Sequence, residues 1–146
     1  MERVGTRTLV FLRHGQYDAE NGGSLTVLGR EQARLAGKYL ETFRFDVVWS
    51  STLTRAKETA DIVSTHLGGM KVRHTGLLRE GLYTKVEGYE VPASERREDR
   101  ARADAAYAKI VRTSRSDRAE LVVCHGNLIS TSCAGHFIRQ PPSGYA

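Results

Sequence analysis

The sequence contains few cysteines, few prolines and no long apolar run, and each shortage excludes a class of protein. Its two cysteines, Cys124 and Cys133, are too few for a disulfide framework. No run approaches the roughly 20 apolar residues of a transmembrane helix, and no signal peptide precedes the first apolar run. We therefore expect a protein of the reduced cytoplasm that has no membrane partner.

Composition and charge are those of an ordinary globular protein. The chain has 146 residues, of which 40% are hydrophobic and 27% charged, so we expect one domain that spans residues 1–146. The formal net charge of +5 favours anionic partners such as phosphorylated metabolites, phosphoproteins or nucleic acid. Because the sequence has no stripe of aromatic and basic residues and no recognised nucleic-acid motif, we expect no nucleic-acid partner.

Short apolar runs alternate along the chain with segments of helical periodicity. The apolar runs predict four strands, at residues 8–12, 45–49, 71–74 and 121–124. The periodic segments predict helices at 26–43, 53–67 and 94–114, and a last helix from Leu128 that ends before Pro141. This alternation favours an α/β fold, a three-layer sandwich whose mainly parallel sheet is covered by helices on both faces.

The periodic positions also predict which face of each helix is buried. For the first helix, with Thr26 as N-cap, the apolar face comprises Leu28, Leu35, Ala36, Tyr39, Leu40 and Phe43. For the second, which Gly68–Gly69 ends, it comprises Leu53, Ala56, Ala60, Val63 and Leu67. For the third, it comprises Ala103, Ala106, Tyr107, Ile110 and Val111. We expect the mixed-charge run 96–100 of the third helix to be a solvated surface.

Two of the predicted strands end in a histidine followed by a glycine. Arg13-His14-Gly15 follows the first strand, and His125-Gly126-Asn127 follows the fourth. In a parallel sheet the carboxyl ends of the strands meet at one edge, where ligands bind. Arg55, in the first turn of the second helix, points back to this edge because helical side chains lean toward the N-terminus. Two histidines, two arginines and a helix N-terminus predict a pocket for a dianion such as a phosphoryl group.

Five stretches of sequence carry a family resemblance. They are Arg13-His14-Gly15; Leu25-Thr26 through Gly29 to Gln32-Ala33; Ser51-Thr52-Leu53-Thr54-Arg55-Ala56 with Thr59-Ala60; Glu80-Gly81; and His125-Gly126-Asn127. In this order they resemble the histidine phosphatase superfamily, also called phosphoglycerate mutase-like. The finer match, at Arg13-His14-Gly15-Gln16-Tyr17, Leu77-Leu78-Arg79-Glu80 and the approach to Val123-Cys124-His125, is most similar to the mitochondrial phosphoglycerate mutase family member 5 type of protein serine/threonine phosphatase.

The resemblance implies a chemical role for five residues. His14 would attack phosphorus and carry the phosphoryl group, while Arg13, Arg55 and His125 would bind the phosphoryl oxygens. Glu80 would protonate the leaving oxygen and then activate water, and its leucine neighbours favour the protonated form by desolvation. The resemblance implies no metal and no other cofactor, because the cationic side chains supply the compensating charge.

The same resemblance implies that Gln16, Asn21, Ser51 and Asn127 line the substrate pocket. For Gln16, Asn21 and Ser51, simple loop-forming and capping roles are the alternative. His66, His74 and His136 match no motif, so we expect them to be surface or structural residues. Cys124 faces the opposite side of its strand from His125, which favours a buried small hydrophobe over a thiol nucleophile.

The chain departs from the family after Asn127. The family continues there through an apolar helix into a further strand, whereas the stretch from Ile129 to Gly135 is polar and the sequence ends at Ala146. We therefore expect the C-terminal edge of the sheet to be shortened or rebuilt. The predicted catalytic positions all precede this departure.

The leading functional prediction is a metal-independent phosphatase that acts through phosphohistidine on a phosphorylated small molecule or a phosphoprotein. A phosphoglycerate mutase, which is an isomerase with the same residues, is the first alternative. Mutases of the family have a longer insertion between the positions of Glu80 and His125, and the short interval here favours entry of water and hydrolysis. A non-catalytic phosphate-binding module is the second alternative, and no motif encodes the oligomeric state.

Overall fold

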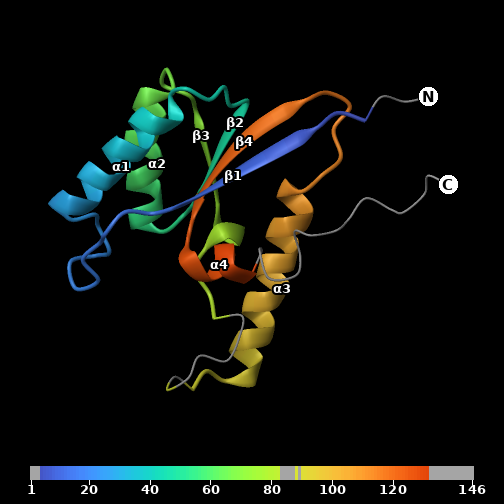
Figure 1. Ribbon diagram of the computed structural model, residues 1–146. Helices are drawn as coiled ribbons and strands as arrows, with labels where there is room; N and C mark the ends of the chain where they lie inside the picture. Colours follow the sequence, from blue (N-terminus) through green and yellow to red (C-terminus); the bar gives the residue numbers. More distant parts are fainter. Residues whose placement is uncertain (1–3, 83–87, 89, 132–146) are drawn as a thin grey trace.

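Four parallel strands form a single sheet in the order β1-β4-β2-β3. The structure is a computed structural model, which describes residues 4–82, 88 and 90–131 (Figure 1). The elements are β1 Arg7–Arg13, α1 Val27–Leu40, β2 Val47–Ser51, α2 Thr54–His66, β3 Val72–Thr75, the 3₁₀ helix η1 Gly76–Leu78, α3 Ala93–Ile110, β4 Arg118–Cys124 and α4 Gly126–Thr131. The predicted alternation of strands and helices is therefore confirmed.

The first and last strands lie side by side although more than a hundred residues separate them. β1 pairs with β4 in parallel, so that Arg13 lies opposite Cys124, and β4 also pairs in parallel with β2. The main-chain pairing extends one residue further, since the backbone N–H of His14 donates to the carbonyl of Cys124 at 3.1 Å. The predicted meeting of the two histidine motifs at one edge of the sheet is confirmed.

Helices cover both faces of the sheet, as the alternation of apolar side chains along the strands requires. One face packs Val48, Leu121 and Val123 against α1 and α2, and the other packs Val47, Val122 and Cys124 against α3 and α4. Figure 1 shows α1 and α2 together on one side of the strands and α3 on the other. This arrangement confirms the predicted three-layer α/β sandwich.

The helix α1 buries a face that overlaps only in part with the one predicted. Thr26 caps it, as expected, with its hydroxyl accepting from the backbone N–H of Gly29 at 3.0 Å. The buried residues are Gly29, Ala33, Gly37 and Leu40. Of the predicted face, Leu40 is buried and Ala36 packs against the core, as expected, whereas Leu28, Leu35 and Tyr39 are exposed and Phe43 lies beyond the end of the helix. The reason is close packing against α2, which small residues permit and large ones would prevent.

The helix α2 follows its predicted stripe closely. Ala56, Ala60 and Val63 are completely buried, whereas Leu53 and Leu67 flank the helix as its cap residues. Gly68 and Gly69 end it in left-handed conformations, with φ of 74° and 72°. α2 therefore holds a fixed position against β2, and its first turn lies beside the carboxyl ends of the strands.

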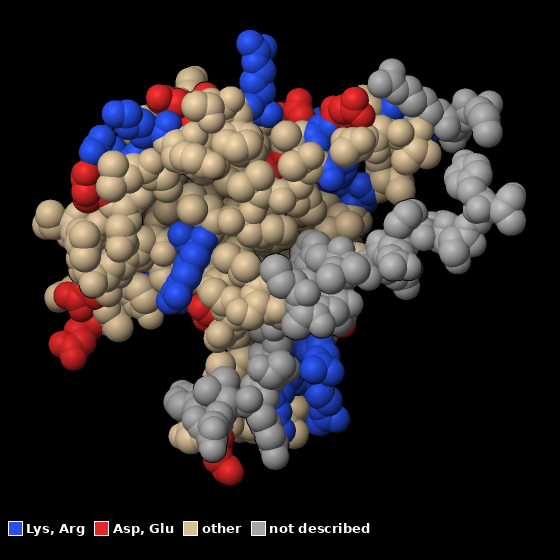
Figure 2. Space-filling model, in the orientation of Figure 1, with Lys and Arg blue, Asp and Glu red and all other residues tan. Residues whose placement is uncertain are grey.

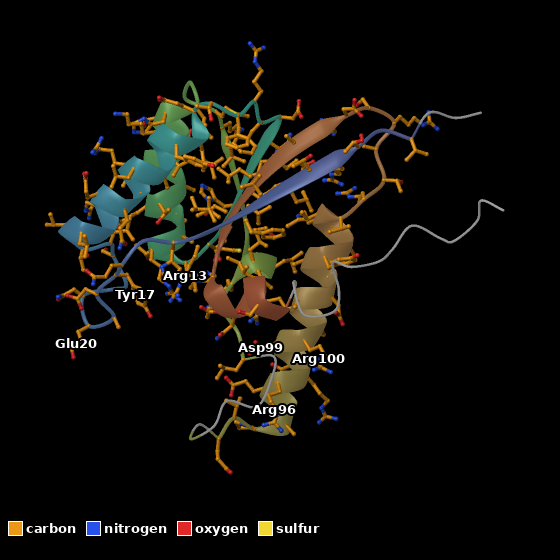
Figure 3. All side chains as sticks on the ribbon, in the orientation of Figure 1. Arg13, Tyr17, Glu20, Arg96, Asp99 and Arg100 are labelled. Atoms are coloured by element: carbon orange, nitrogen blue, oxygen red, sulfur yellow. The ribbon has the colours of Figure 1, made fainter. Side chains whose placement is uncertain are left out.

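The helix α3 contradicts one prediction. Ala106 and Ile110 are buried as expected, but so is Asp99, inside the run expected to be solvated. Arg100, the next residue, is exposed. Figure 3 shows Asp99 on the side of α3 that faces the segment after η1, with Arg100 on the far side. The mixed-charge run 96–100 therefore includes one buried carboxylate, that of Asp99, which has specific hydrogen-bond partners.

The last described helix, α4, begins at Gly126, two residues before the predicted start at Leu128. Its Leu128 packs into the core on the α3 side of the sheet. The expectations for Cys133, His136 and the C-terminal edge of the sheet fall on residues 132–146, which lie outside the described residues. Among the helices described, none has the length and apolarity to cross a membrane.

Candidate active site

The loop that carries His14 passes unusually close to the start of α1. A side chain added at Gly15 would overlap the carbonyl of Gly29, and one added at Gly29 would overlap the carbonyl of Gln16. The backbone N–H of Gly15 donates to the hydroxyl of Thr59 on α2 at 3.1 Å. Two glycines and one threonine thus fix the direction in which the loop leaves β1.

The imidazole of His14 is held in one tautomer. Its Nδ1 lies 2.8 Å from the carbonyl of Gly15, which can only accept, so Nδ1 carries the hydrogen and Nε2 a lone pair. Burial lowers the pKa of His14, and the nearby charges of Arg55 and Arg13 lower it further, against the Gly15 bond that raises it. His14 is therefore neutral at physiological pH, which leaves Nε2 able to attack an electrophile.

Arg55 reaches His14 from the first turn of α2, as its position predicted. Its Nε donates to Nε2 of His14 at 3.1 Å, and its Cζ lies 4.3 Å from the ring centroid of Tyr17. Tyr17 also meets the ring of His14 edge-on, with centroids 5.3 Å apart. Sequence reasoning did not identify Tyr17 or Thr59 as parts of the site; an aromatic residue three positions after a motif histidine was the available signal for Tyr17.

His125 lies beside His14 with ring centroids 5.0 Å apart, and its side chain is fully buried. Its Nε2 is 2.9 Å from the hydroxyl of Ser51, while its Nδ1 has no hydrogen-bond partner among the described residues. Burial, with the charges of Arg55 and Arg13 and of a protonated His14, lowers the pKa of His125 to about 3. A second neutral imidazole therefore borders the site.

Glu80 approaches from the segment that follows η1. One carboxyl oxygen, Oε2, lies 3.7 Å from Nδ1 of His125, and the other, Oε1, is buried without a hydrogen-bond partner among the described residues. Burial raises the pKa of Glu80, and the opposing effects of Arg55, of the backbone N–H groups of Asn127 and Gly81, and of Arg13 are smaller. Desolvation thus favours a carboxyl that keeps its proton, as the apolar neighbours in the sequence predicted.

Arg13 lies at the mouth of the site and is exposed. A Cβ on Gly126 would be 3.5 Å from its guanidinium carbon, which places the group across the start of α4. In Figure 2 a basic side chain crosses the middle of a largely uncharged face, at the place where Figure 3 labels Arg13. The two guanidinium groups therefore flank the two imidazoles, and an open hollow of about 530 Å³ reaches His14 from the side of α1.

The four residues expected to line the substrate pocket have different surroundings. Gln16 borders the hollow, and its side-chain oxygen accepts from the hydroxyl of Thr26 at 2.8 Å. Asn21 donates to Asp18 at 2.5 Å within its own exposed loop. Ser51 is completely buried and contacts His125, and Asn127 is exposed beside Glu80. Ser51 is thus placed to orient a histidine, and Asn21 to shape a loop.

The other two described histidines and the described cysteine lie outside this cluster. His66 packs against α1 beside Gly37, and His74 is exposed on β3. Cys124 is buried in the core, where desolvation raises the pKa of its thiol to about 12. A thiol that stays protonated is a poor nucleophile, so Cys124 has the structural surroundings that we expected.

One arrangement in the site satisfies the distances of a metal centre. Ligand atoms of His14, Glu80 and His125 all lie within 4.8 Å of one another. Two features disfavour a cation here: the guanidinium groups of Arg13 and Arg55 point to the same place, and Nε2 of His14 already accepts from Arg55. Like charges repel, whereas a phosphoryl dianion is attracted by both arginines. The site therefore suits an oxyanion better than a metal ion.

Comparison with known proteins shows which family and which relatives the sequence matches. The family model of the histidine phosphatase superfamily (branch 1) matches residues 9–100. The chain is 35% identical to the mouse protein named serine/threonine-protein phosphatase PGAM5, mitochondrial, over 96% of this chain and 53% of that relative. The corresponding protein of Caenorhabditis elegans is 36% identical over 97% and 54%. The chain thus spans about half the length of the curated relatives that it matches.

Solved structures share the fold. The mycobacterial glucosyl-3-phosphoglycerate phosphatase Rv2419c, in its native form, is similar with a TM-score of 0.67 and 26% identity, over 93% of this chain and 81% of that one. A phosphoglycerate mutase from Plasmodium falciparum is similar with a TM-score of 0.61 and 26% identity, over 87% and 66%. Hydrolases and a mutase are therefore both among the structural neighbours.

Proposed function

Because the chain belongs to the histidine phosphatase superfamily, branch 1, we propose that it hydrolyses phosphomonoesters through a phosphohistidine intermediate on His14. The observation that carries this proposal is the geometry around His14 and Glu80, together with the opposite directions in which burial shifts their pKa values. Burial lowers the pKa of His14, whose Nδ1 proton is committed to Gly15, and burial raises the pKa of Glu80. A neutral nucleophile and a protonated carboxyl side by side are what phosphoryl transfer to an imidazole requires.

In the first step, the Nε2 lone pair of His14 forms a bond to phosphorus, and the bond from phosphorus to the ester oxygen breaks. The proton of Glu80 passes to the departing oxygen, so that the alcohol leaves neutral. Arg55, which donates to Nε2 at 3.1 Å, exchanges this acceptor for a phosphoryl oxygen as the substrate binds. Arg13 adds a second guanidinium, and both stabilise the charge of the transferring group.

In the second step, water attacks the phosphorus atom of phosphohistidine. The carboxylate of Glu80 accepts a proton from this water, and the bond from phosphorus to Nε2 of His14 breaks. Inorganic phosphate leaves, and the enzyme regains a neutral His14 and a protonated Glu80. Arg13 and Arg55 supply positive charge in both steps, so that the proposal includes no metal and no other cofactor.

His125 has the complementary task of donating a hydrogen bond to the phosphoryl group. The hydroxyl of Ser51 accepts from the backbone N–H of Leu53 at 3.2 Å, which leaves its own hydrogen for Nε2 of His125 at 2.9 Å. The hydrogen of His125 is then on Nδ1, the atom that faces Glu80. We assign Ser51 as the residue that sets this tautomer, and Gln16 and Asn127 as groups that border the bound substrate.

The proposed substrates are phosphate esters of a protein side chain or of a small molecule. The name of the mammalian and nematode relatives supports the first class, and that of the mycobacterial neighbour the second. The proposed compartment is the cytoplasm, which the small number of cysteines supports and the word mitochondrial in the relatives' names opposes. Fractionation of cells that express the tagged protein decides between the two compartments.

Phosphoglycerate mutase activity is the second candidate, which the similarity to the Plasmodium enzyme supports. A mutase returns the phosphoryl group from histidine to a second hydroxyl of the same substrate, and so must retain its intermediate. The short interval between Glu80 and His125 favours entry of water, and therefore hydrolysis.

The test is a screen of the purified chain, in chelator, over phosphosugars, phosphoserine and phosphothreonine peptides, p-nitrophenyl phosphate and 3-phosphoglycerate. We expect release of phosphate that disappears in His14→Ala, whose unfolding transition stays at the wild-type temperature. Interconversion of 3- and 2-phosphoglycerate faster than release of phosphate would identify a mutase instead. Failure to turn over any ester, with phosphate bound normally, would identify a non-catalytic phosphate-binding module.

A further inference from the structure

Asp99 is the buried charged residue of α3, most of whose other charged residues are exposed, and both of its oxygens are used. Its Oδ2 accepts from the backbone N–H of Leu82 at 2.8 Å, and its Oδ1 lies 2.6 Å from Nη2 of Arg102, one turn further along α3. Figure 3 shows Asp99 on the side of α3 nearest this segment, whereas Arg96 and Arg100 lie elsewhere on the helix. A buried carboxylate so engaged fixes the position of the chain that it contacts.

Arg102 completes the contact on the other side of Gly81. Its Nη2 donates to the carbonyl of Glu80 at 3.0 Å, so the same guanidinium nitrogen links Asp99 to the residue proposed as the general acid. The N–H of Leu82 and the carbonyl of Glu80 are therefore both tied to α3. The peptide units on either side of Gly81 cannot rotate without breaking one of these bonds.

Gly81 permits this close approach. A Cβ at this position would lie 2.7 Å from Cγ of Asp99 and 2.7 Å from Nη2 of Arg102, closer than real side chains come. The φ angle of Gly81 is outside the left-handed region that favours glycine, so the backbone conformation alone does not require a glycine here. A glycine is required because the side chains of Asp99 and Arg102 occupy the space that a Cβ at this position would need.

The carboxyl group of Glu80 has weak anchors of its own. Oε1 is buried without a hydrogen-bond partner among the described residues, and Oε2 is 3.7 Å from Nδ1 of His125, beyond hydrogen-bond length. The backbone N–H groups of Asn127, in α4, and of Gly81 also act on this carboxyl, so its position depends on the course of its own backbone as well as on α4. Displacement of a proton donor by about 1 Å is enough to cost about a hundredfold in rate.

We propose that Asp99 and Arg102 are positioning residues, which hold the backbone at Glu80 so that its carboxyl delivers a proton to the leaving oxygen. The inference rests on the proposed phosphatase function and extends it to two residues on α3. The rival interpretation is that these contacts only attach α3 to the rest of the domain. The two differ in their consequences, because a misplaced acid harms esters with poor leaving groups, whereas a loosened domain harms all substrates alike.

The test measures phosphorylation of His14 in single turnover with an alkyl phosphate and with p-nitrophenyl phosphate. The variants are Asp99→Ala and Arg102→Met, with the exposed neighbour Glu98→Gln as matched control. We expect the alkyl phosphate rate to fall by about tenfold or more and the aryl rate by less than about twofold, because p-nitrophenolate departs without a proton. In the Glu80→Gln background, neither variant should reduce the alkyl rate further, since the group that it positions is gone.

Equal losses for the two esters, or a full additional loss in the Glu80→Gln background, would overturn the inference. Asp99→Ala leaves Arg102 without its carboxylate and can unfold the helix; Arg102→Met, at a side chain that is 28% exposed, then carries the test alone. Glu80→Gln alone distinguishes failure of the general-acid assignment from failure of the positioning role. If it shows no preference for the aryl ester, the assignment of the general acid fails; if it does and the α3 variants do not, only the positioning role fails.

Discussion

Nε of Arg55 donates to Nε2 of His14 at 3.1 Å, so that the cation of the site is bonded to the very lone pair proposed to attack phosphorus. The same guanidinium lies 4.3 Å from the ring centroid of Tyr17, and the carbonyl of Arg55 accepts from Thr59 at 2.7 Å. A planar guanidinium that stacks on Tyr17 can pass one donor to a phosphoryl oxygen and keep its orientation. In the proposed mechanism, binding of the phosphoryl group therefore frees the lone pair of His14.

Replacement of this arginine by lysine keeps the charge and removes the planar group. We expect Arg55→Lys to lose about tenfold or more in kcat/KM, from the ~1.5 to 3 kcal/mol typical of charged hydrogen bonds. Steady-state kinetics with p-nitrophenyl phosphate measure the loss. Arg34→Lys, at an exposed arginine of α1, is the control and should behave as wild type. Unchanged kcat/KM in Arg55→Lys would place this residue outside the phosphoryl site.

The raised pKa of Glu80 predicts the alkaline limb of the pH profile. A carboxyl whose pKa is raised keeps its proton at pH values where an ordinary glutamate has lost it, and loses it as the pH rises through the raised value. We therefore expect single-turnover phosphorylation by an alkyl phosphate to decline with rising pH in the wild type.

In Glu80→Gln, the rate with the alkyl phosphate should be low and this decline should be absent, because glutamine does not titrate. Asp18→Asn, at a carboxylate of the neighbouring loop, serves as control. A decline that persists in Glu80→Gln and disappears in Asp18→Asn would transfer the acid role to Asp18. Glu87, the other carboxylate to test, lies outside the described residues.

The lowered pKa of His125, about 3, predicts a loss of stability in mild acid. Between this value and the ordinary value of 6.5, the unfolded chain binds a proton that the folded chain does not, so the free energy of unfolding falls as the pH falls below 6.5. One such group contributes about 1.4 kcal/mol per pH unit, or about 2 kcal/mol between pH 6.5 and 5.

Urea unfolding at these two pH values measures this difference. We expect it to shrink in His125→Gln, where His14, whose pKa is also lowered, still contributes. His74→Gln, at an exposed histidine of β3, is the matched control and should leave the difference unchanged. If the His125 variant had the full wild-type pH dependence, the buried neutral imidazole would not be its source.

The sequence predicted the placement of the histidines and of Arg55 because both follow from simple geometry. Parallel strands gather their carboxyl ends at one edge, and a residue in the first turn of a helix leans back toward it. The buried stripe of α2 was equally clear, because Ala56, Ala60 and Val63 recur at helical spacing.

The face of α1 could not be found in the same way. Large apolar residues at Leu28, Leu35 and Tyr39 indicated one face, but the helix packs through Gly29, Ala33 and Gly37. Small residues carry little hydropathy signal, and they are buried here because two helices approach closely. Which face is buried depends on how α2 packs against α1, and the periodicity of α1 carries no information about α2.

Asp99 shows a second limit of local patterns. A carboxylate within a mixed-charge run is typical of a solvated surface. Of the two partners of Asp99, one can be suggested from the sequence and the other cannot. The link to Arg102 is an i, i+3 pair, which spacing alone can suggest. The link to the backbone of Leu82, seventeen residues earlier, involves no side-chain type and leaves no trace in the sequence. Only the folded chain brings these groups together.

The most direct test of the account is to trap the phosphorylated enzyme. The wild-type chain is incubated with a radiolabelled phosphate ester that has a fast leaving group, quenched in acid or base, and the labelled peptide is sequenced by mass spectrometry. The phosphohistidine mechanism predicts an acid-labile, base-stable phosphoryl group on His14, absent from His14→Ala and present in the His74→Ala control. Label on a serine or cysteine, or turnover by His14→Ala at the wild-type rate, would contradict it.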